Sequence, residues 1–193
     1  MKVTEVQFIK SVFSPSELPR PGLPEIALCG RSNVGKSSMI NVLLHRRIAK
    51  TSATPGRTQS INFILVNRSF FFVDLPGYGY ARVPERIRQG WRILIESYLA
   101  YRTSLRCVVL IVDARRTPEH DEISLTQWFA LHTIPWVVAV TKIDKLAHQH
   151  YRTACTKWHQ ALRPAATFAF SSLTGYGIHE AWKTIGTFLE NKK

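Results

Sequence analysis

Along most of the chain, short apolar segments of strand length alternate with segments whose apolar residues recur every three or four positions. The clearest helical spacing is that of Ile87, Trp91, Leu94, Ile95 and Tyr98, which would share one face of a helix. Such alternation favours right-handed β–α–β crossovers, a mostly parallel sheet and helices on both of its faces. The pattern predicts strands at 25–29, 61–66, 70–73, 106–112, 136–140 and 167–170, and helices at 36–45, from 84 onwards, and at 118–132, 148–162 and 178–189.

Two parts of the chain depart from this alternation. The apolar segments 61–66 and 70–73 are joined only by residues 67–69, which is the pattern of an antiparallel hairpin. Residues 1–22 form an N-terminal lead-in segment that ends in the turn-rich sequence P-R-P-G, and its apolar residues near position 8 are placed to add an edge strand. We therefore predict one three-layer α/β domain over 23–193, with one antiparallel edge hairpin in a mostly parallel sheet.

The composition adds a strong positive charge to this picture. The 193 residues include 26 Lys and Arg against 13 Asp and Glu, which gives a formal net charge of +13. A charge of this size favours a polyanionic partner, either nucleic acid or an acidic membrane surface, although charge alone is equally compatible with an inert basic surface.

Several classes of protein are excluded by the same sequence. No apolar run approaches the roughly 18 residues of a membrane-spanning helix, and the N-terminal residues lack the apolar stretch of a signal peptide. The three cysteines, Cys29, Cys107 and Cys155, have no metal-binding or redox spacing. We therefore expect reduced thiols and a cytoplasmic protein.

A phosphate-binding motif follows the first predicted strand of the domain. Residues 30–37, G-R-S-N-V-G-K-S, match G-x-x-x-x-G-K-[ST] at every fixed position. The two glycines let the backbone curl so that successive N–H groups face phosphate oxygens, while Lys36 reaches the β- and γ-phosphates and the Ser37 hydroxyl can ligate Mg²⁺. The predicted phosphate-contacting residues are Gly30, Arg31, Ser32, Asn33, Val34, Gly35, Lys36, Ser37 and Ser38.

Three further motifs each follow another predicted strand, where ligands bind in parallel α/β sheets. The carboxylate of Asp74 is placed to hold Mg²⁺ through water, and the Gly77 N–H to sense a γ-phosphate. Asp144 can accept hydrogen bonds from guanine N1–H and N2–H₂, which adenine does not offer, while Lys142 packs its stem over the base. The segments are Asp74-Leu75-Pro76-Gly77, Thr141-Lys142-Ile143-Asp144 and Phe170-Ser171-Ser172, the last with backbone N–H groups placed to reach guanine O6.

In this order, the motifs resemble those of the translation-factor-like P-loop GTPases. The sequences G-R-S-N-V-G-K-S-S at 30–38, T-P-G-R-T-Q at 54–59, D-L-P-G-Y-G-Y-A at 74–81 and T-K-I-D-K at 141–145 further resemble the EngB (YihA/YsxC) family of bacterial ribosome-assembly GTPases. The resemblance covers about residues 6 to 190. It implies the P-loop GTPase fold, GTP and GDP as ligands, slow GTP hydrolysis, and a role in large-subunit assembly that is needed for normal cell division and septation.

The resemblance also implies roles for a segment that the phosphate motif alone does not define. Thr58 matches the threonine that joins Ser37 in the Mg²⁺ shell when GTP is bound, so Lys36 and Thr58 are the implied catalytic residues. The segment that would lie over the triphosphate is Gly56, Arg57, Thr58, Gln59 and Ser60.

Three positions bear on hydrolysis. Tyr78 stands where many GTPases have the glutamine that orients the attacking water, and tyrosine cannot orient that water in the same way. Asn33 matches an asparagine that supports a potassium ion beside the phosphates in some related GTPases, which makes K⁺ a candidate cofactor. Arg57 is either an internal arginine finger or a solvated loop residue.

Two groups of basic residues indicate where an RNA would be contacted, although a solvated helical face would have the same composition. Tyr151 and Trp158 are expected as exposed aromatic residues beside the second group, whereas Trp91, Trp136 and Trp182 are expected in the core. The first group is Arg82, Arg86, Arg88, Arg92, Arg102 and Arg106, and the second is Lys145, His148, His150, Arg152, Lys157 and Arg163.

With the family resemblance, the expected partners are the large ribosomal subunit and its ribosomal RNA. We expect no DNA and no membrane partner, and a monomer. One alternative is a nucleotide-gated RNA-binding module in which hydrolysis is incidental. A GTPase recruited to a membrane surface by its basic face is less favoured, because no amphipathic anchor or lipidation signal is present.

Overall fold

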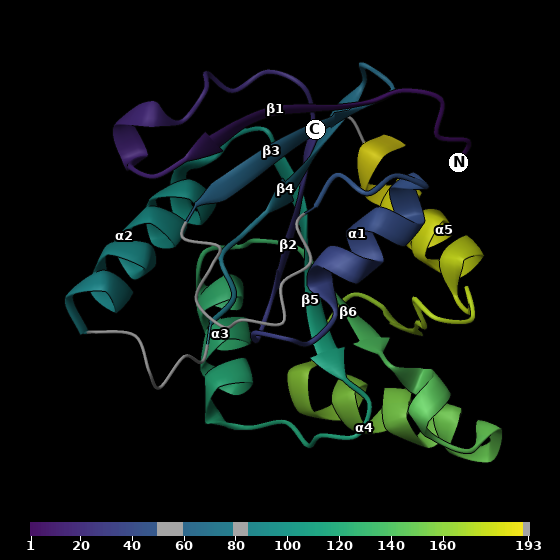
Figure 1. The fold of residues 1–193 in the computed structure, drawn as a ribbon. Coiled ribbons are helices and arrows are strands. Elements are labelled where there is room, and N and C mark those ends of the chain that lie inside the picture. The colour runs from purple at the N-terminus through teal and green to yellow at the C-terminus, as the bar shows by residue number, and fades with distance from the viewer. Residues whose placement is uncertain (50–59, 79–84, 191–193) are drawn as a thin grey trace.

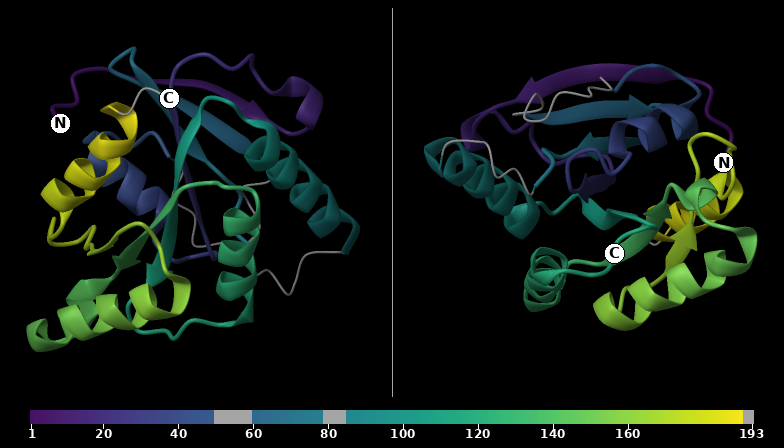
Figure 2. Two further views of the ribbon diagram at one scale, coloured as in Figure 1. Left: turned by 180° about the vertical axis from the view of Figure 1, so that it is seen from behind. Right: turned by 60° about the horizontal axis from the view of Figure 1, so that its bottom comes forward.

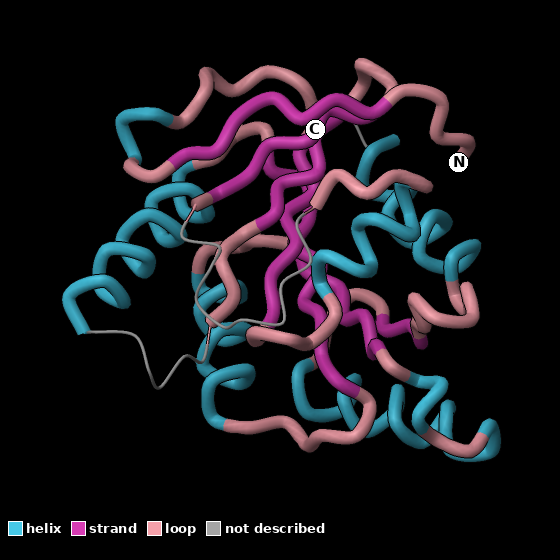
Figure 3. The backbone as a smooth tube through the Cα atoms, in the orientation of Figure 1, coloured by secondary structure: helices cyan, strands magenta, loops and turns pink. Residues whose placement is uncertain are grey.

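A single twisted sheet with helices on both faces organises the chain in the computed structural model, which describes residues 1–49, 60–78 and 85–190 (Figures 1 and 3). Seven strands in this described part lie in the order β1-β3-β4-β2-β5-β6-β7. β3 is antiparallel to both of its neighbours, and every other pair is parallel. The strands are β1 (Val6–Val12), β2 (Glu25–Gly30), β3 (Ile61–Val66), β4 (Phe70–Asp74), β5 (Leu105–Asp113), β6 (Trp136–Thr141) and β7 (Thr167–Ala169).

The helices divide between the two faces because successive residues of each buried strand point to opposite sides. Ala27 and Cys29 of β2 share a core with α2, α3 and α4, whereas Ile26 and Leu28 share a core with α1 and α5 (Figure 2). The helices are α1 (Lys36–Leu44), α2 (Glu85–Tyr101), α3 (His120–Leu131), α4 (Tyr151–Leu162) and α5 (Ile178–Glu190), with short 3₁₀ turns at Pro15–Glu17, Ile143–Lys145 and His148–His150.

The predicted alternation and the three-layer α/β architecture are confirmed, with small shifts at the ends of helices. α3 begins at His120 instead of 118, because the side chains of Glu119 and Glu122 form a capping box around its first turn. The helix predicted over 148–162 begins as a 3₁₀ turn and becomes α-helical at Tyr151. The lead-in segment contributes β1, which pairs with β3 at the sheet edge as expected.

Two side chains assigned to the basic, RNA-facing groups are buried instead. Trp158 is 1% exposed, because Ala154, Trp158 and Leu162 recur every four residues and form the inner face of α4. The guanidinium of Arg102 is enclosed against Glu25, with 6% of the side chain exposed. Trp182 lies in the core shared with α1 and α5, as predicted, and Trp136 is partly buried against the core on the opposite face of the sheet.

Some of the remaining expectations concern residues that lie outside the described part of the chain. The side chains at 79–92, which include Trp91 and four arginines of the first basic group, lie outside the described residues. Pro84 also lies outside them. Within the described residues, no helix combines the length and the apolar character that crossing a lipid bilayer requires.

A buried charge fixes the start of β2. Glu25 is fully buried and accepts hydrogen bonds from the Tyr98 hydroxyl at 2.9 Å, the Ser104 hydroxyl at 2.8 Å and the Arg102 guanidinium at 2.6 Å. Arg102 also donates to the carbonyl of Pro19. Burial, followed by the Glu25 charge, raises the pKa of Tyr98 well above its usual value. One carboxylate therefore joins the lead-in segment, β2 and the end of α2.

We expect Glu25→Gln to lower the free energy of unfolding by about 3–5 kcal/mol, because it leaves the buried Arg102 charge without its counter-ion. The matched control is Glu5→Gln, which removes the partner of the exposed Arg68 at 2.9 Å and should cost less than about 1 kcal/mol. Urea unfolding followed by circular dichroism measures both. Equal losses in the two variants would contradict the structural role of Glu25.

Candidate nucleotide-binding site

The four predicted motifs lie at one edge of the sheet. Each follows the carboxyl end of a strand, and the four strands concerned are β2, β4, β6 and β7. Because these strands are mutually parallel, their carboxyl ends open on the same side of the domain.

Both glycines of the first motif are required by the backbone. A Cβ on Gly30 would lie 2.5 Å from the carbonyl oxygen of Ile111 in β5, so only glycine lets the chain leave β2 at this point. Gly35 has a φ of +108° immediately before α1 begins at Lys36. The loop therefore turns directly into a helix N-terminus, whose unpaired N–H groups favour an anion.

The two charges predicted to act on the phosphates lie side by side. The Nζ of Lys36 forms an ion pair with Oδ1 of Asp74, and both residues are more than nine-tenths buried. Ser37 and Ser38 occupy the first turn of α1 and are partly exposed. The arrangement brings an ammonium group, a carboxylate and two hydroxyls to one helix N-terminus.

The segment after β4 lies directly against the phosphate loop. The Tyr78 N–H donates to the Gly30 carbonyl at 3.3 Å, and the Ser32 N–H donates to the Tyr78 carbonyl at 3.2 Å. A Cβ on Gly77 would lie 3.3 Å from the backbone of Ser32, so Gly77 is also at a close approach. Residues 77 and 78 therefore cannot move without affecting the phosphate loop.

The side chain of Tyr78 is directed towards α3. Its hydroxyl lies 3.4 Å from Oε1 of Glu122 and its ring packs against the core. Burial raises the pKa of the Tyr78 phenol above its usual value. The hydroxyl is thus a neutral group engaged with α3, and the expectation that tyrosine does not orient the attacking water as glutamine does stays a prediction.

The side chain of Arg31 is directed away from the phosphate loop and towards α3. Its guanidinium contacts the acidic start of α3, with nitrogen–oxygen distances of 2.5 Å to Glu119, 3.4 Å to Asp121 and 3.7 Å to Glu122. The hydrogen bond from Arg31 lowers the pKa of Glu119. Because its side chain is occupied in this way, only the backbone of Arg31 faces the predicted phosphate site.

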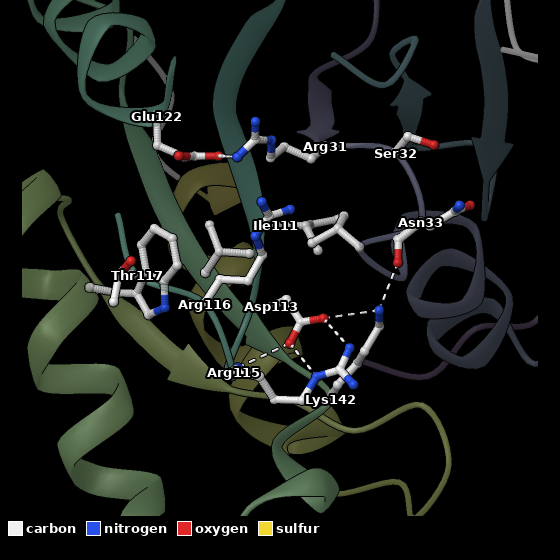
Figure 4. Close-up of a pocket in the computed structure, with 13 residues that line it drawn as sticks. Arg31, Ser32, Asn33, Ile111, Asp113, Arg115, Arg116, Thr117, Glu122 and Lys142 are labelled. Atoms are coloured by element: carbon white, nitrogen blue, oxygen red, sulfur yellow. Dashed lines mark hydrogen bonds and ion pairs between the residues drawn. The ribbon is translucent and has the colours of Figure 1, made fainter. Parts of the chain in front are cut away.

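Lys142 joins the phosphate loop to the end of β5 (Figure 4). Its Nζ donates to the carbonyl of Asn33 at 2.7 Å and lies 3.0 Å from Oδ2 of Asp113. Arg115 also donates to Asp113, at 2.9 Å and 2.7 Å. Burial by itself would raise the pKa of Asp113, but the hydrogen bonds from Arg115 and Lys142 outweigh it and hold that pKa below the ordinary value.

Sequence reasoning missed Asp113 and Arg115, although one signal was present. Asp113 ends a buried strand in the same way as Asp74, so the rule that selected the other strand ends applies to it as well.

Behind the phosphate loop, a cavity of about 380 Å³ is lined by residues 31–34, 111–113 and 115–117, by Glu122 and Lys142, and by Trp158 (Figure 4).

The predicted guanine-contacting residues come together at the other end of the site. Oδ1 of Asp144 accepts a hydrogen bond from the Ser171 hydroxyl at 2.5 Å, and Oδ2 lies 3.7 Å from Nζ of Lys145. The same Ser171 oxygen accepts from the backbone N–H groups of Leu173 and Thr174, both at 3.2 Å. Asp144 is therefore held in place by the loop that was predicted to meet guanine O6.

Several predicted contact residues position the backbone instead of offering a side chain. The hydroxyl of Thr141 lies 2.7 Å from the carbonyl of Val34 and 2.8 Å from that of Val112, so it fastens the phosphate loop to β5 and β6. The Ser60 hydroxyl donates to Asn62 at 3.1 Å. All the apolar side chains among the predicted contacts are buried, namely Val34, Leu75, Pro76, Ile143 and Phe170.

The remaining predicted residues fall into two groups. Ser172 and Gly77 are partly exposed at the strand ends, as the pattern required. Gly56, Arg57, Thr58 and Gln59 lie outside the described residues, so the implied metal-binding and catalytic roles of Thr58 stay predictions.

Sequence comparisons identify relatives of the whole chain. A model of the family described as "50S ribosome-binding GTPase" matches residues 25–142, which is more than half of the chain. A protein of Desulforapulum autotrophicum named as a probable GTP-binding protein EngB is 44% identical over 98% of this chain and 99% of its own length. A protein of the same name from Geobacter metallireducens is 45% identical over 98% of this chain and 94% of its own length.

Solved structures show the same fold. A crystal structure of a probable GTP-binding protein EngB superposes with a TM-score of 0.72 at 22% identity, covering 87% of this chain and all of that one. The structure of Era in complex with MgGDPNP and nucleotides of 16S ribosomal RNA superposes with a TM-score of 0.70 at 21% identity, covering 90% of this chain and 59% of that one. The predicted P-loop GTPase fold is thereby confirmed.

We expect Asp144→Asn to lose guanosine nucleotides and to gain xanthosine nucleotides, because the amide of asparagine offers a donor where the base must now present an acceptor. The matched control is Asp113→Asn, a strand-end carboxylate that contacts Lys142 and Arg115 and should leave the choice of base unchanged. Competition of GTP, ATP and XTP against a fluorescent GDP analogue measures the preference of the unmodified protein and of Asp113→Asn, and direct titration with fluorescent GDP and XDP analogues measures that of Asp144→Asn. Equal competition by ATP and GTP in the unmodified protein would contradict the assignment of Asp144.

Proposed function

The chain belongs to the EngB family of GTP-binding proteins and is a GTPase, and from this premise we propose that it acts as a GTP/GDP switch in the assembly of the large ribosomal subunit. The observation that carries the proposal is the meeting of the four motifs at one sheet edge, with Lys36 beside Asp74 at one end and Asp144 beside Ser171 at the other. The description of the matching family and the net charge of +13 support a ribosomal partner.

The residues at the phosphate end fit a bound magnesium ion. Mg²⁺ prefers oxygen ligands and keeps several waters, so one serine hydroxyl and one carboxylate acting through water suffice beside phosphate oxygens. Ser37 and Asp74 are these residues here. We propose that they hold Mg²⁺ together with Thr58, and that the ion neutralises charge on the phosphates when it is bound.

Hydrolysis in this site depends mainly on electrostatics. Lys36 and the N–H groups at the start of α1 stabilise charge that is already on the phosphates, while Thr58 is proposed to complete the site from the segment 56–60. Tyr78 contributes no water-orienting amide, and its hydroxyl is engaged by Glu122. We therefore propose slow turnover by the isolated protein, well below the roughly 1–100 s⁻¹ of kinases.

The proposed cellular role follows from the partner. A switch that gates assembly of the large subunit would act in the cytoplasm, and its loss would limit the ribosome supply and so disturb cell division and septation.

The Tyr78–Glu122 contact also supports the second candidate, a nucleotide-gated RNA-binding module with incidental hydrolysis. Multiple-turnover hydrolysis with and without large subunits distinguishes the two, because only the first candidate requires turnover on the subunit.

We expect the protein to co-sediment with large rather than small ribosomal subunits, and more strongly with a non-hydrolysable GTP analogue than with GDP. Each neutralised phosphate releases condensed counter-ions, so log K should fall with log salt by about 0.7–0.9 per contact. As a control, binding of Asp144→Asn to the large subunit should depend on xanthosine nucleotides and not on guanosine nucleotides. Equal binding in the two nucleotide states would contradict the switch, and a flat salt response would contradict an RNA interface.

Asn33 provides a separate test of the proposed potassium ion. It is exposed in the phosphate loop at a φ of +60°, and its carbonyl already accepts from Lys142. If its side-chain oxygen supports a cation, K⁺ should raise the hydrolysis rate above that in Na⁺. Asn33→Gly, which tolerates the backbone conformation, should remove the difference, whereas Asn33→Asp should keep it. Identical rates in the two salts would exclude the potassium ion.

A further inference from the structure

One stretch of the chain carries positive charge without any acidic residue. From Lys145 to His179 the sequence contains no Asp or Glu, and it contains four Lys and Arg and four His. α4 occupies the middle of this stretch and lies at the periphery of the molecule in all the views of Figures 1 and 2. The stretch therefore adds only positive charge to the surface, and no acidic residue of the described part of the chain lines the groove along α4.

The outer face of α4 is polar and cationic along its whole length. Arg152 is exposed at its first turn and Arg163 at its end, roughly 16 Å apart at 1.5 Å per residue. Lys157 lies between them and donates to the carbonyl of Arg116 at 2.7 Å, which joins α4 to the basic loop after β5. A shallow groove of about 620 Å³ follows this face, lined by Arg152, Thr153, Thr156, Lys157, Gln160 and Ala161.

Aromatic rings stand at one end of this cationic face. The ring of His148 lies 4.9 Å from that of Tyr151, and the ring of Tyr151 lies 5.3 Å from that of Tyr176 in an edge-to-face arrangement. Tyr176 is 45% exposed, and Leu173, three residues before it, is 76% exposed. Exposed rings beside cations are the arrangement on which proteins stack unpaired bases.

The aromatic end is connected to the proposed guanine site. The Ser171 N–H donates to the carbonyl of Tyr176 at 3.0 Å, and the Ser171 hydroxyl donates to Asp144. The loop that presents Tyr176 is therefore the loop that orients Asp144. A ligand that orders this loop from outside would also act on the base-recognition end of the site.

We propose that the α4 face, defined as Arg152, Thr156, Lys157 and Arg163 together with Tyr176, binds RNA, with an unpaired base stacked on Tyr176 and phosphates along the two arginines. The inference rests on the proposed function, since it names the surface that meets the RNA. RNA fits this face better than an anionic membrane does, because the side chains between the cations are Thr, Gln and one Ala and offer no row of large apolar residues for insertion.

The first test measures binding of a fluorescent 12-nucleotide uridine RNA by anisotropy. Arg152→Glu combined with Arg163→Glu should weaken binding about tenfold and flatten the slope of log K against log salt by about 1.4, since each lost single-strand contact accounts for about 0.7. The matched control, Arg20→Glu with Lys183→Glu, changes the net charge equally at exposed positions outside the α4 face. Equal weakening by the two pairs would overturn the proposal.

The second test addresses stacking. Tyr176→Ala should weaken binding of the uridine RNA at least about fivefold and leave a 12-base-pair RNA duplex nearly unaffected, whereas Tyr176→Phe should bind both as the unmodified protein does. Equal losses on single strand and duplex would overturn the stacking role. A charge reversal on α4 that weakens binding to phosphatidylglycerol vesicles but not to RNA would assign the face to a membrane and overturn the proposal.

The same variants separate this inference from the proposed function. GDP affinity should be unchanged in the α4 charge variant and in its control, and cooperative urea unfolding shows that each variant, including those at Tyr176, is folded. Suppose that the unmodified protein binds large subunits in a nucleotide-dependent way and that the α4 variants bind RNA as well as their controls do. The proposal that the α4 face binds RNA is then wrong, and the proposed switch is retained. If the α4 variants lose RNA binding while subunit binding does not depend on the nucleotide, the proposal for the α4 face is retained and the proposed switch is wrong.

Discussion

The ion pair between Lys36 and Asp74 is the constraint around which the site is built. Lys36 begins α1 and Asp74 ends β4, and both groups are withdrawn from water, where an unpaired charge would be strongly destabilising. Anything that binds between them must therefore supply a negative charge to the ammonium group and a positive charge to the carboxylate. A nucleotide phosphate accompanied by Mg²⁺ meets both requirements at once.

Several contacts hold the phosphate loop against the rest of the domain. Gly30 passes against β5, Tyr78 pairs with the loop backbone, Arg31 holds the start of α3, and Lys142 holds the carbonyl of Asn33. These contacts fix the direction of the loop N–H groups before a ligand arrives, which lowers the entropic cost of binding. They also mean that a change at residues 77–78 reaches α3 through both Tyr78 and Arg31.

Much of this arrangement was predictable, because strand ends and glycine spacing are local properties of the sequence. The positions of Lys36, Asp74 and Asp144 followed from motifs placed after apolar segments, and the structure brings them to one edge. The direction of the Arg31 side chain, the burial of Trp158 and the pairing of Arg102 with Glu25 did not follow, because each depends on a partner far away in the sequence. Helical periodicity contained the signal for Trp158, since Ala154 and Leu162 share its face, but its neighbouring charges favoured exposure.

The most direct measurement is the GDP affinity of Lys36→Ala and Asp74→Asn, determined by calorimetry with and without Mg²⁺. Lys36→Ala should lose about a hundredfold in affinity under both conditions, because a charged hydrogen bond to phosphate is removed. Asp74→Asn should lose only the part of the affinity that Mg²⁺ contributes, and both variants should unfold cooperatively. Affinity equal to that of the unmodified protein in a folded Lys36→Ala variant would contradict the account.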